Sequence, residues 1–373
     1  MKRHQLEQII SGKSRGIAPA ALRMTLSTLT PIYRAAISVR NFMFDRGWRK
    51  IETGGLPVIS VGNLTVGGTG KTPFVAWLAR TIIALHKRPA IISRGYGRGQ
   101  SLHNDEYLEL QIRLPHTEHL QDPNRVALAR RLAEQNDADV LLLDDGFQHR
   151  RLHRDLDIVL IDCTCPFGYD RLLPRGLLRE PLQALRRAHV IALTRVDQVS
   201  ENQRNEIKRR VTSIFKQHGH GQAESADNRL VNLHLPIFAE VSFVPTHVTS
   251  QETHLELADI RNRKPIAFCG IGNPVGFQNL LTQLCGERSF GAANQLLVFP
   301  DHHAFNRSDV DSILQAAHQF GADIVLCTLK DYVKVSRIWP DRATSIPLGA
   351  VVVEAEFRSG ETQVQQLISH LLA

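Results

Sequence analysis

A glycine-rich turn between an expected strand and an expected helix constrains this 373-residue chain most. The apolar run 56–61 leads into Thr65-Val66-Gly67-Gly68-Thr69-Gly70-Lys71-Thr72, and a helix-like segment follows over 73–86. Such a turn presents backbone N–H groups and the positive end of a helix to an anion, and the Lys71 ammonium adds a mobile charge. The sequence therefore predicts a phosphate-binding loop for a nucleoside triphosphate, formed by residues 65–72.

The loop departs from the usual pattern G-x-x-x-x-G-K-[ST] at its first position, where Thr65 replaces glycine. Gly67, Gly68 and Gly70 still supply backbone freedom to the turn. The alternative is an ordinary glycine turn before a helix. Because Gly70-Lys71-Thr72 stands directly between strand and helix, we favour the phosphate site.

Short apolar runs separated by helix-length stretches predict a mostly parallel, doubly wound α/β sheet. They lie at 56–61, 88–92, 140–143, 157–161 and 190–193, and a second series lies at 265–268, 295–299, 323–326 and 350–355. One core usually stops growing at roughly 250–300 residues, so we expect two α/β/α domains. The predicted parts are a basic amphipathic segment 1–50, a P-loop kinase domain 51–230 and a smaller α/β domain 231–373 with linking strands.

Positive charge is concentrated at the N-terminus. Residues 1–50 carry ten lysines and arginines against two acidic residues, which accounts for the whole formal charge of +8. This argues against a nucleic-acid binder and for a local anionic partner. Residues 20–44 repeat apolar side chains every three or four positions, as in an interfacial helix that Pro31 would kink or divide. A helix docked on the protein's own core has almost equal weight, and an organelle transit peptide ranks third.

The five cysteines form no zinc-type pair of pairs, which suits a reducing, cytoplasmic compartment. Cys163 and Cys165 are expected to pack rather than to bind a soft metal. The sequence has no apolar stretch of the roughly 18–20 residues that spanning a bilayer requires.

Two carboxylates, Asp144 and Asp145, follow the apolar run 140–143. Oxygen ligands at the tip of a strand suit Mg²⁺, so Thr72 and one of these aspartates are predicted to hold the ion while Lys71 offsets phosphate charge. A helix cap is the alternative for the acidic pair.

Several further motifs follow one another in order over nearly the whole chain. They are Val61-Gly62-Asn63-Leu64 with the loop above, Ser93-Arg94-Gly95-Tyr96-Gly97, Asp144-Asp145-Gly146-Phe147-Gln148-His149-Arg150, Leu173-Pro174-Arg175-Gly176, Arg179-Glu180-Pro181, Gly270-Ile271-Gly272-Asn273-Pro274, Pro300-Asp301-His302-His303 and Thr328-Leu329-Lys330-Asp331. Together these motifs resemble those of the tetraacyldisaccharide 4'-kinase family, the lipid A 4'-kinases of Gram-negative envelope synthesis.

The resemblance implies that ATP, with Mg²⁺, donates its γ-phosphoryl group to the 4'-hydroxyl of a tetraacylated glucosamine disaccharide 1-phosphate. It implies a peripheral enzyme at the cytoplasmic face of the inner membrane, where anionic lipid would attract the basic N-terminus. The oligomeric state stays open. The alternatives are a nucleotide-gated switch or metal-delivery ATPase, and a soluble kinase of a small polar metabolite.

The resemblance also implies that Asp105 is the base for the acceptor hydroxyl and that His302 is its companion, which we expect lobe closure to bring near. A helix N-cap is the alternative role for Asp105. Asn104 departs from the glycine usual there and tolerates the left-handed backbone region.

Arg94 and Arg179 are predicted to clamp phosphate oxygens, and Glu180 is predicted to support magnesium or Arg94. Surface arginines are the alternative. The loop Thr194-Arg195-Val196-Asp197, which ends an expected strand, is expected near the nucleotide base. His149, Asp301 and His303 remain ambiguous between structural and chemical roles.

Overall fold

The computed structural model describes residues 3–95, 104–216, 235–250, 254–286, 290, 295–340 and 346–373. The chain forms two compact units. The larger unit combines Leu6–Tyr96, Leu114–Phe243 and Ala355–Ala373, and the smaller unit combines Met1–Gln5, Gly97–Arg113 and Val244–Glu354. Each unit is therefore assembled from segments that are distant in the sequence.

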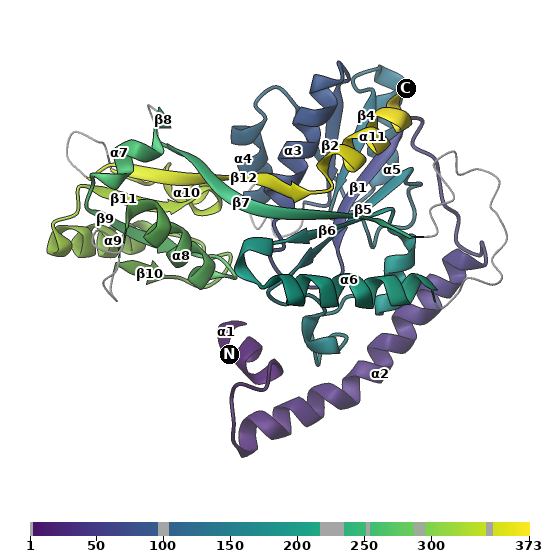
Figure 1. The fold of residues 1–373 in the computed structure, drawn as a ribbon, viewed down its shortest axis with the longest axis horizontal. Coiled ribbons are helices and arrows are strands. Elements are labelled where there is room, and N and C mark those ends of the chain that lie inside the picture. Colours follow the sequence, from purple (N-terminus) through teal and green to yellow (C-terminus); the bar gives the residue numbers. More distant parts are fainter. Residues whose placement is uncertain are drawn as a thin grey trace. The chain divides into compact units, whose positions relative to one another are not determined.

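The larger unit contains a parallel sheet in the order β7-β6-β5-β1-β4-β2-β3 (Figure 1). The strands are β1 (Val58–Asn63), β2 (Pro89–Ser93), β3 (Glu118–Gln121), β4 (Val140–Asp144), β5 (Leu156–Asp162), β6 (Val190–Thr194) and the first part of β7 (Ile237–Thr249). Every residue of β1, β2, β4 and β6 is buried, because both faces of a parallel sheet are covered. The predicted α/β class is confirmed, whereas the polar strand β3 was not foreseen.

Helices of the larger unit connect these strands or follow the last strand of the chain. The connecting helices are α3 (Lys71–Ala84), α5 (Arg125–Gln135), α6 (Glu201–Lys216) and the 3₁₀ helices η1 (Gly168–Asp170), η2 (Leu182–Arg187) and η3 (Val196–Gln198), and α11 (Glu361–Leu372) ends the chain. The C-terminal helix α11 packs here because Trp77 Nε1 donates to Glu361 Oε1 at 3.1 Å and the Trp77 ring lies against Phe357. A short helix α1 (Arg3–Ile10) precedes all of them.

The smaller unit contains four parallel strands in the order β10-β9-β11-β12, which belong to the same 12-stranded sheet as the strands above. Its elements are β8 (His254–Leu255), β9 (Pro265–Cys269), β10 (Leu296–Val298), β11 (Ile324–Thr328), β12 (Leu348–Ser359), α4 (Asp105–Arg113), α7 (Leu257–Arg261), α8 (Pro274–Cys285), α9 (Arg307–Phe320) and α10 (Leu329–Val335). The long strands β7 and β12 each pass from one unit into the other.

Helix α4 belongs to the smaller unit although the segments on both sides of it belong to the larger one. It packs against α10, and Arg113 Nη1 donates to the Val353 carbonyl at 2.8 Å. The domain boundaries predicted from composition divide the chain into three consecutive segments, so they do not assign a segment within the first domain to the second. They stay predictions, and the boundary at 230 lies outside the described residues.

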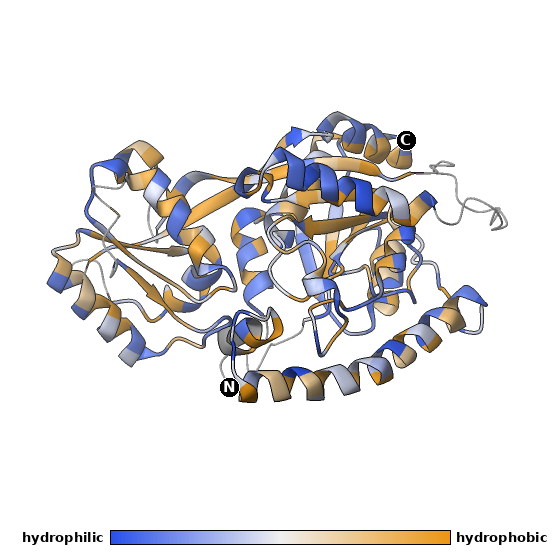
Figure 2. Ribbon diagram, turned by 60° about the horizontal axis from the view of Figure 1, so that its bottom comes forward, coloured by the Kyte–Doolittle hydropathy of each residue, from blue (hydrophilic) through white to orange (hydrophobic). Residues whose placement is uncertain are grey.

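Helix α2 (Ile17–Asp45) is continuous through Pro31, so of the kink or division expected at this proline the division is wrong. Contacts beyond the proline hold it, since the Tyr33 hydroxyl donates to the Arg179 carbonyl at 2.9 Å and Phe44 is buried. The hydropathy colours of Figure 2 mark apolar residues spaced among polar ones along this helix. Its most exposed large side chains are Ile17 (91%), Met24 (73%), Ile32 (68%) and Val39 (59%).

None of the helices in the described ranges combines the length and the apolar character that crossing a membrane needs.

The replacement Gly62→Ala tests the close approach of β1 to the loop after β4. A Cβ at Gly62 would lie 2.6 Å from Phe147 Cβ and 2.8 Å from the Phe147 backbone nitrogen. We expect a loss of about 1–3 kcal/mol, because backbone atoms must shift. Urea unfolding followed by circular dichroism measures it. Gly68→Ala is the control, since nothing lies within 4 Å of that site, and an equal urea midpoint for both variants would contradict the close approach.

Candidate functional site

The glycine-rich turn lies where the sequence predicts it, between the end of β1 at Asn63 and the start of α3 at Lys71. Gly70 caps α3 with a φ of 85°, in the left-handed region that favours glycine. A Cβ at Gly70 would also lie 2.0 Å from Phe243 Cζ. Gly67 has a φ of 132°. The turn therefore depends on glycine at these two positions, and the N-terminus of α3 opens toward it.

Side chains from the end of β6 hold the carbonyl groups of this turn. Thr194 Oγ1 donates to the Thr69 carbonyl at 3.0 Å, and Arg195 Nη2 donates to the Gly68 carbonyl at 2.8 Å. Arg195 also pairs with Asp162 at the end of β5. The Thr194-Arg195 segment, expected near the nucleotide base, thus contacts the phosphate loop itself.

Three cations converge on Asp145. Lys71 Nζ lies 3.7 Å from Asp145 Oδ1, Arg179 Nη1 lies 2.8 Å from Oδ2, and Arg125 donates to the Asp145 carbonyl at 3.1 Å. Burial alone would raise the pKa of Asp145, but Lys71 and Arg179 outweigh it and hold the pKa at about 2. Lys71 is also oriented by the Asn63 side chain, whose Oδ1 accepts at 3.3 Å. Asn63 and Arg125 were missed by the sequence reasoning.

Asp144 and Thr72 supply the oxygen donors expected of a magnesium site. Asp144 ends β4 beside Val61 of β1, is 2% exposed, and precedes the ionised Asp145. Thr72 is the second residue of α3. In the described part of the chain no three His, Cys, Asp or Glu side chains form a metal cage. Mg²⁺ usually takes one or two carboxylates together with phosphate oxygens, so this donor set fits it.

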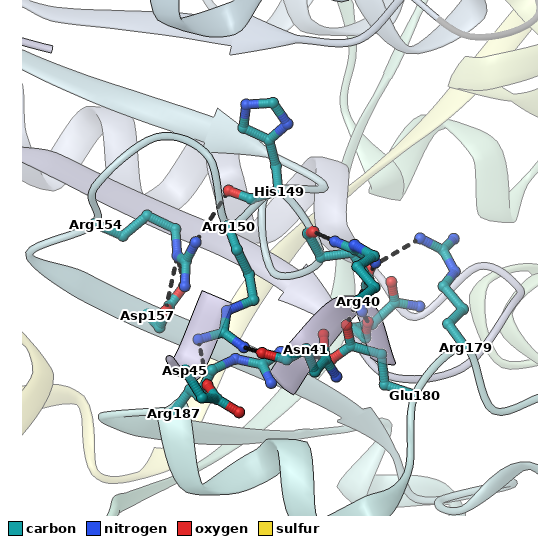
Figure 3. Close-up of polar contacts among 12 residues, drawn as sticks. Arg40, Asn41, Asp45, His149, Arg150, Arg154, Asp157, Arg179, Glu180 and Arg187 are labelled. Atoms are coloured by element: carbon teal, nitrogen blue, oxygen red, sulfur yellow. Dashed lines mark hydrogen bonds and ion pairs between the residues drawn. The ribbon is translucent and has the colours of Figure 1, made fainter. Parts of the chain in front are cut away.

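Glu180, predicted to support magnesium, is fully buried and pairs with arginines (Figure 3). Its Oε2 lies 2.5 Å from Arg187 Nη2 in η2, and its Oε1 lies 3.8 Å from Arg40 Nη1 in α2. The carboxylate thus joins α2 to the segment that carries Arg179. The metal role of Glu180 stays a prediction, and these contacts favour a structural one.

The loop after β4 is fastened to α2 as well. Arg150 Nη2 lies 2.6 Å from Asp45 Oδ1, and Arg150 Nη1 donates to the Asn41 carbonyl at 3.2 Å (Figure 3). Burial, and then neighbouring arginines such as Arg125, lower the pKa of His149 to about 4. The ring is therefore uncharged at neutral pH, which favours its structural interpretation.

Arg94 lies directly after β2 and is exposed, and its charge lowers the pKa of Arg125, which burial lowers most. This places Arg94 on the same side of the sheet as the Asp145 cluster. Its partners Tyr96 and Gly97 in the family motif lie outside the described residues.

In the smaller unit, Asp105 begins α4, but it does not cap the helix. The Asn104 side chain performs that role by accepting from the Tyr107 backbone N–H at 3.0 Å. The capping alternative for Asp105 is therefore wrong, and its carboxylate is available for other contacts. Asn104 replaces the expected glycine with a residue that fixes the start of the helix.

His302 Nδ1 lies 3.3 Å from Asp105 Oδ2, and both residues belong to the smaller unit. The expectation that lobe closure brings them together is wrong, because α4 packs in the unit that carries His302. His302 has a φ of 59°, a sparsely populated conformation for a residue other than glycine.

The neighbours of His302 separate into two roles. His303 Nε2 lies 3.0 Å from Asp309 Oδ2, and Asp309 completes the capping box of α9, so this pair is structural. Asp301 Oδ1 lies 3.3 Å from Lys330 Nζ. Lys330 and Lys334 of α10 were missed; their spacing of four residues in a short helix was the available signal.

The cysteines behave as packing residues. All five are free thiols, and Cys163 is buried. Burial raises the pKa of the Cys163 thiol to about 12, so the thiol is protonated at neutral pH and packs as a small apolar group.

Comparisons with known proteins give one consistent result. A family model described as tetraacyldisaccharide-1-P 4'-kinase matches residues 22–373. A tetraacyldisaccharide 4'-kinase of Anaeromyxobacter sp. (strain Fw109-5) is 34% identical over 388 residues, covering 99% of this chain and 96% of the relative. A Geobacter sulfurreducens protein of that name is 34% identical and covers 93% of each chain. A crystal structure of LpxK from Aquifex aeolicus in complex with ATP matches with a TM-score of 0.67 and 28% identity, covering 94% of this chain and all of that chain.

Glu180→Gln and Asp144→Asn separate a structural carboxylate from a metal ligand. We expect Glu180→Gln to destabilise the protein by about 1–3 kcal/mol, because it leaves two partly buried guanidinium groups without their buried counter-charge. The Mg²⁺ concentration for half-maximal activity should not change. Asp144→Asn should raise that concentration about tenfold or more at an unchanged urea midpoint. A tenfold Mg²⁺ shift for Glu180→Gln with wild-type stability would instead assign Glu180 to the metal.

Proposed function

Because the chain belongs to the tetraacyldisaccharide-1-P 4'-kinase family, we propose that its phosphate loop holds ATP while Asp105 accepts the proton of the sugar hydroxyl. The reaction is the ATP-dependent phosphorylation of the 4'-hydroxyl of a tetraacylated glucosamine disaccharide 1-phosphate, a step of lipid A biosynthesis. One observation supports Asp105 as the base: its carboxylate lies 3.3 Å from His302 and does not cap α4, because the Asn104 side chain does so.

The transfer has a simple balance. The 4'-oxygen forms a bond to the γ-phosphorus of ATP, the bond from that phosphorus to the β–γ bridging oxygen breaks, and ADP leaves. The hydroxyl proton moves to Asp105. Lys71, held between Asn63 and Asp145, is placed to offset negative charge on the β- and γ-phosphates.

Arginines complete the proposed site. The guanidinium groups of Arg179, which pairs with Asp145, and of the exposed Arg94 are proposed to bind phosphate oxygens. Thr72 with Asp144 or Asp145 would hold Mg²⁺, which would neutralise negative charge on the phosphate groups when bound.

Helix α2 supports a peripheral location at the cytoplasmic face of the inner membrane. Its exposed apolar side chains, with Met24 and Ile32 among them, stand on a segment whose charge is strongly positive. Such a helix binds in the plane of an anionic bilayer, where its apolar face is buried among acyl chains. An acylated substrate stays in that bilayer, so the enzyme has to approach it there.

Labelled ATP tests the reaction and the base together. The wild-type protein should move the γ-phosphate label into the acylated disaccharide 1-phosphate. Asp105→Asn should lower kcat by about a hundredfold or more and leave the KM for ATP unchanged, because it removes only proton acceptance. Asp309→Asn is the matched control, since it alters another Asp–His pair with a separation of 3.0 Å in the same unit and should keep wild-type kcat. Label found only in free phosphate would favour a nucleotide switch.

Flotation with vesicles containing phosphatidylglycerol tests the membrane face. Met24→Ser with Ile32→Ser should lower the bound fraction more than tenfold, since burying one such side chain contributes about 1.5–3 kcal/mol. Transfer to detergent-dispersed substrate should stay at the wild-type level. Phe320→Ser, at a 43% exposed apolar residue of α9, is the control that should bind normally. Unchanged flotation of the double variant would argue for a helix that only packs on the protein.

A further inference from the structure

Two lysines on α10 surround the Asp105–His302 pair. Lys330 and Lys334 lie four residues apart, so they project from one face of this helix. Both belong to the smaller unit, as do Asp105 and His302. We call Lys330 and Lys334 the lysine pair.

Lys334 is held by acceptors from three different segments. Its Nζ lies 3.1 Å from Asp105 Oδ2 at the start of α4 and 3.6 Å from Asp331 Oδ1 in its own helix. It also donates to the His303 carbonyl at 3.4 Å, and it lies 5.8 Å from the centroid of the Phe305 ring. The side chain is only 11% exposed, so these contacts replace most of its water.

Asp331 is a second acidic neighbour of Lys334. The residue is fully buried, and its Oδ2 accepts from the Gly270 backbone N–H at 2.9 Å and from Thr328 Oγ1 at 2.7 Å. Its other oxygen faces Lys334. Asp331 is fixed to the residue after β9 and to the start of α10, so Lys334 has a second carboxylate partner besides Asp105.

Lys330 determines which nitrogen of His302 carries the proton. Lys330 Nζ is hydrogen-bonded to His302 Nε2 at 3.1 Å. An ammonium group can only donate, so Nε2 accepts. In the neutral ring the proton is then on Nδ1, the nitrogen that lies 3.3 Å from Asp105 Oδ2.

Asp105 Oδ2 is therefore approached by two donors, the Nδ1–H of His302 and the ammonium group of Lys334. Burial raises the pKa of Asp105, but His302 and Lys334 outweigh it and hold the pKa below its ordinary value. Both donors act on the same oxygen, which leaves the other carboxylate oxygen to face a hydroxyl group. The carboxylate side chain remains 26% exposed for that purpose.

We propose that Lys334 is a positioning residue for the phosphoryl transfer: together with His302 it occupies Oδ2 and fixes the rotation of the Asp105 carboxylate, so that Oδ1 receives the proton of the acceptor hydroxyl. This inference rests on the proposed role of Asp105 as the base. The ammonium group of Lys334 is directed to Asp105, Asp331 and the His303 carbonyl, so its effect on the transfer is exerted through Asp105.

A purely structural role would be to fasten α4 to the rest of the smaller unit. Arg113 does this at the other end of the same helix. Its guanidinium pairs with Glu109 at 2.8 Å and donates to the Val353 carbonyl at 2.8 Å. Arg113 is eight residues from Asp105, about 12 Å along a helix, so it does not contact the carboxylate. It provides a matched comparison for Lys334.

The experiment compares Lys334→Met, Lys334→Arg and Arg113→Met in the full-length protein. For Lys334→Met we expect kcat to fall about tenfold to a hundredfold at neutral pH, with the KM for ATP unchanged. The acidic limb of the profile of kcat/KM against pH should move up by about one unit, because a carboxylate that loses a nearby cation is protonated at higher pH.

Lys334→Arg keeps the charge and should restore the position of the acidic limb. Arg113→Met should lower the urea midpoint and leave the profile unchanged. The proposal is wrong if Lys334→Met shows the wild-type acidic limb, or if its loss of activity matches that of Arg113→Met at equal loss of stability.

Asp105→Asn separates this failure from a failure of the base assignment. If Asp105→Asn abolishes transfer while Lys334→Met has wild-type kcat and pH profile, the base stands and the positioning role falls. If Asp105→Asn retains wild-type transfer, the base assignment itself falls and Lys334 loses its function with it.

Discussion

The parallel pairing of β1 with β4 is the constraint on which the phosphate site depends. In this register Val61 lies beside Asp144, so the loop after β1 and the carboxylates after β4 leave the sheet at the same edge. Gly62 has no side chain, which lets the backbone of Phe147 approach β1 closely. As a result Lys71 lies 3.7 Å from Asp145, although 74 positions of sequence separate them. A shift of one residue in the pairing would move the carboxylates away from the loop.

Two ionised aspartates take different roles because their surroundings differ. Asp145 faces Lys71, Arg179 and Arg125, and its pKa of about 2 makes it a very weak base. It suits the binding of cations and the orientation of Lys71. Asp105 is approached at one oxygen by a single ammonium group and by the ring of His302. A carboxylate with fewer cations and an exposed oxygen is the better proton acceptor of the two.

The helix proposed to lie on the membrane is joined to the residues next to the phosphate site. Tyr33 donates to the Arg179 carbonyl, and Arg40 pairs with the buried Glu180 of the following position. Arg40 also donates to the Gln148 carbonyl in the loop after β4. Helix α2 therefore supports the segment from which Arg179 reaches Asp145, and its outer face remains apolar.

The sequence by itself determined the local features. Runs of apolar residues predict the strands, and the Gly-Lys-Thr turn predicts the phosphate loop. The carboxylate pair after an apolar run marks the edge of the sheet at which the site lies. Each of these patterns depends only on neighbours within a few positions of the sequence. Only the tertiary structure decided that α4 packs with α10, which brings Asp105 to His302 and to Lys334. Only the structure showed that Glu180 pairs with Arg187 and Arg40. Asp105 and His302 are separated by nearly 200 positions of sequence. Their contact depends on how the shapes and charges of distant segments fit together, which a local sequence pattern does not contain.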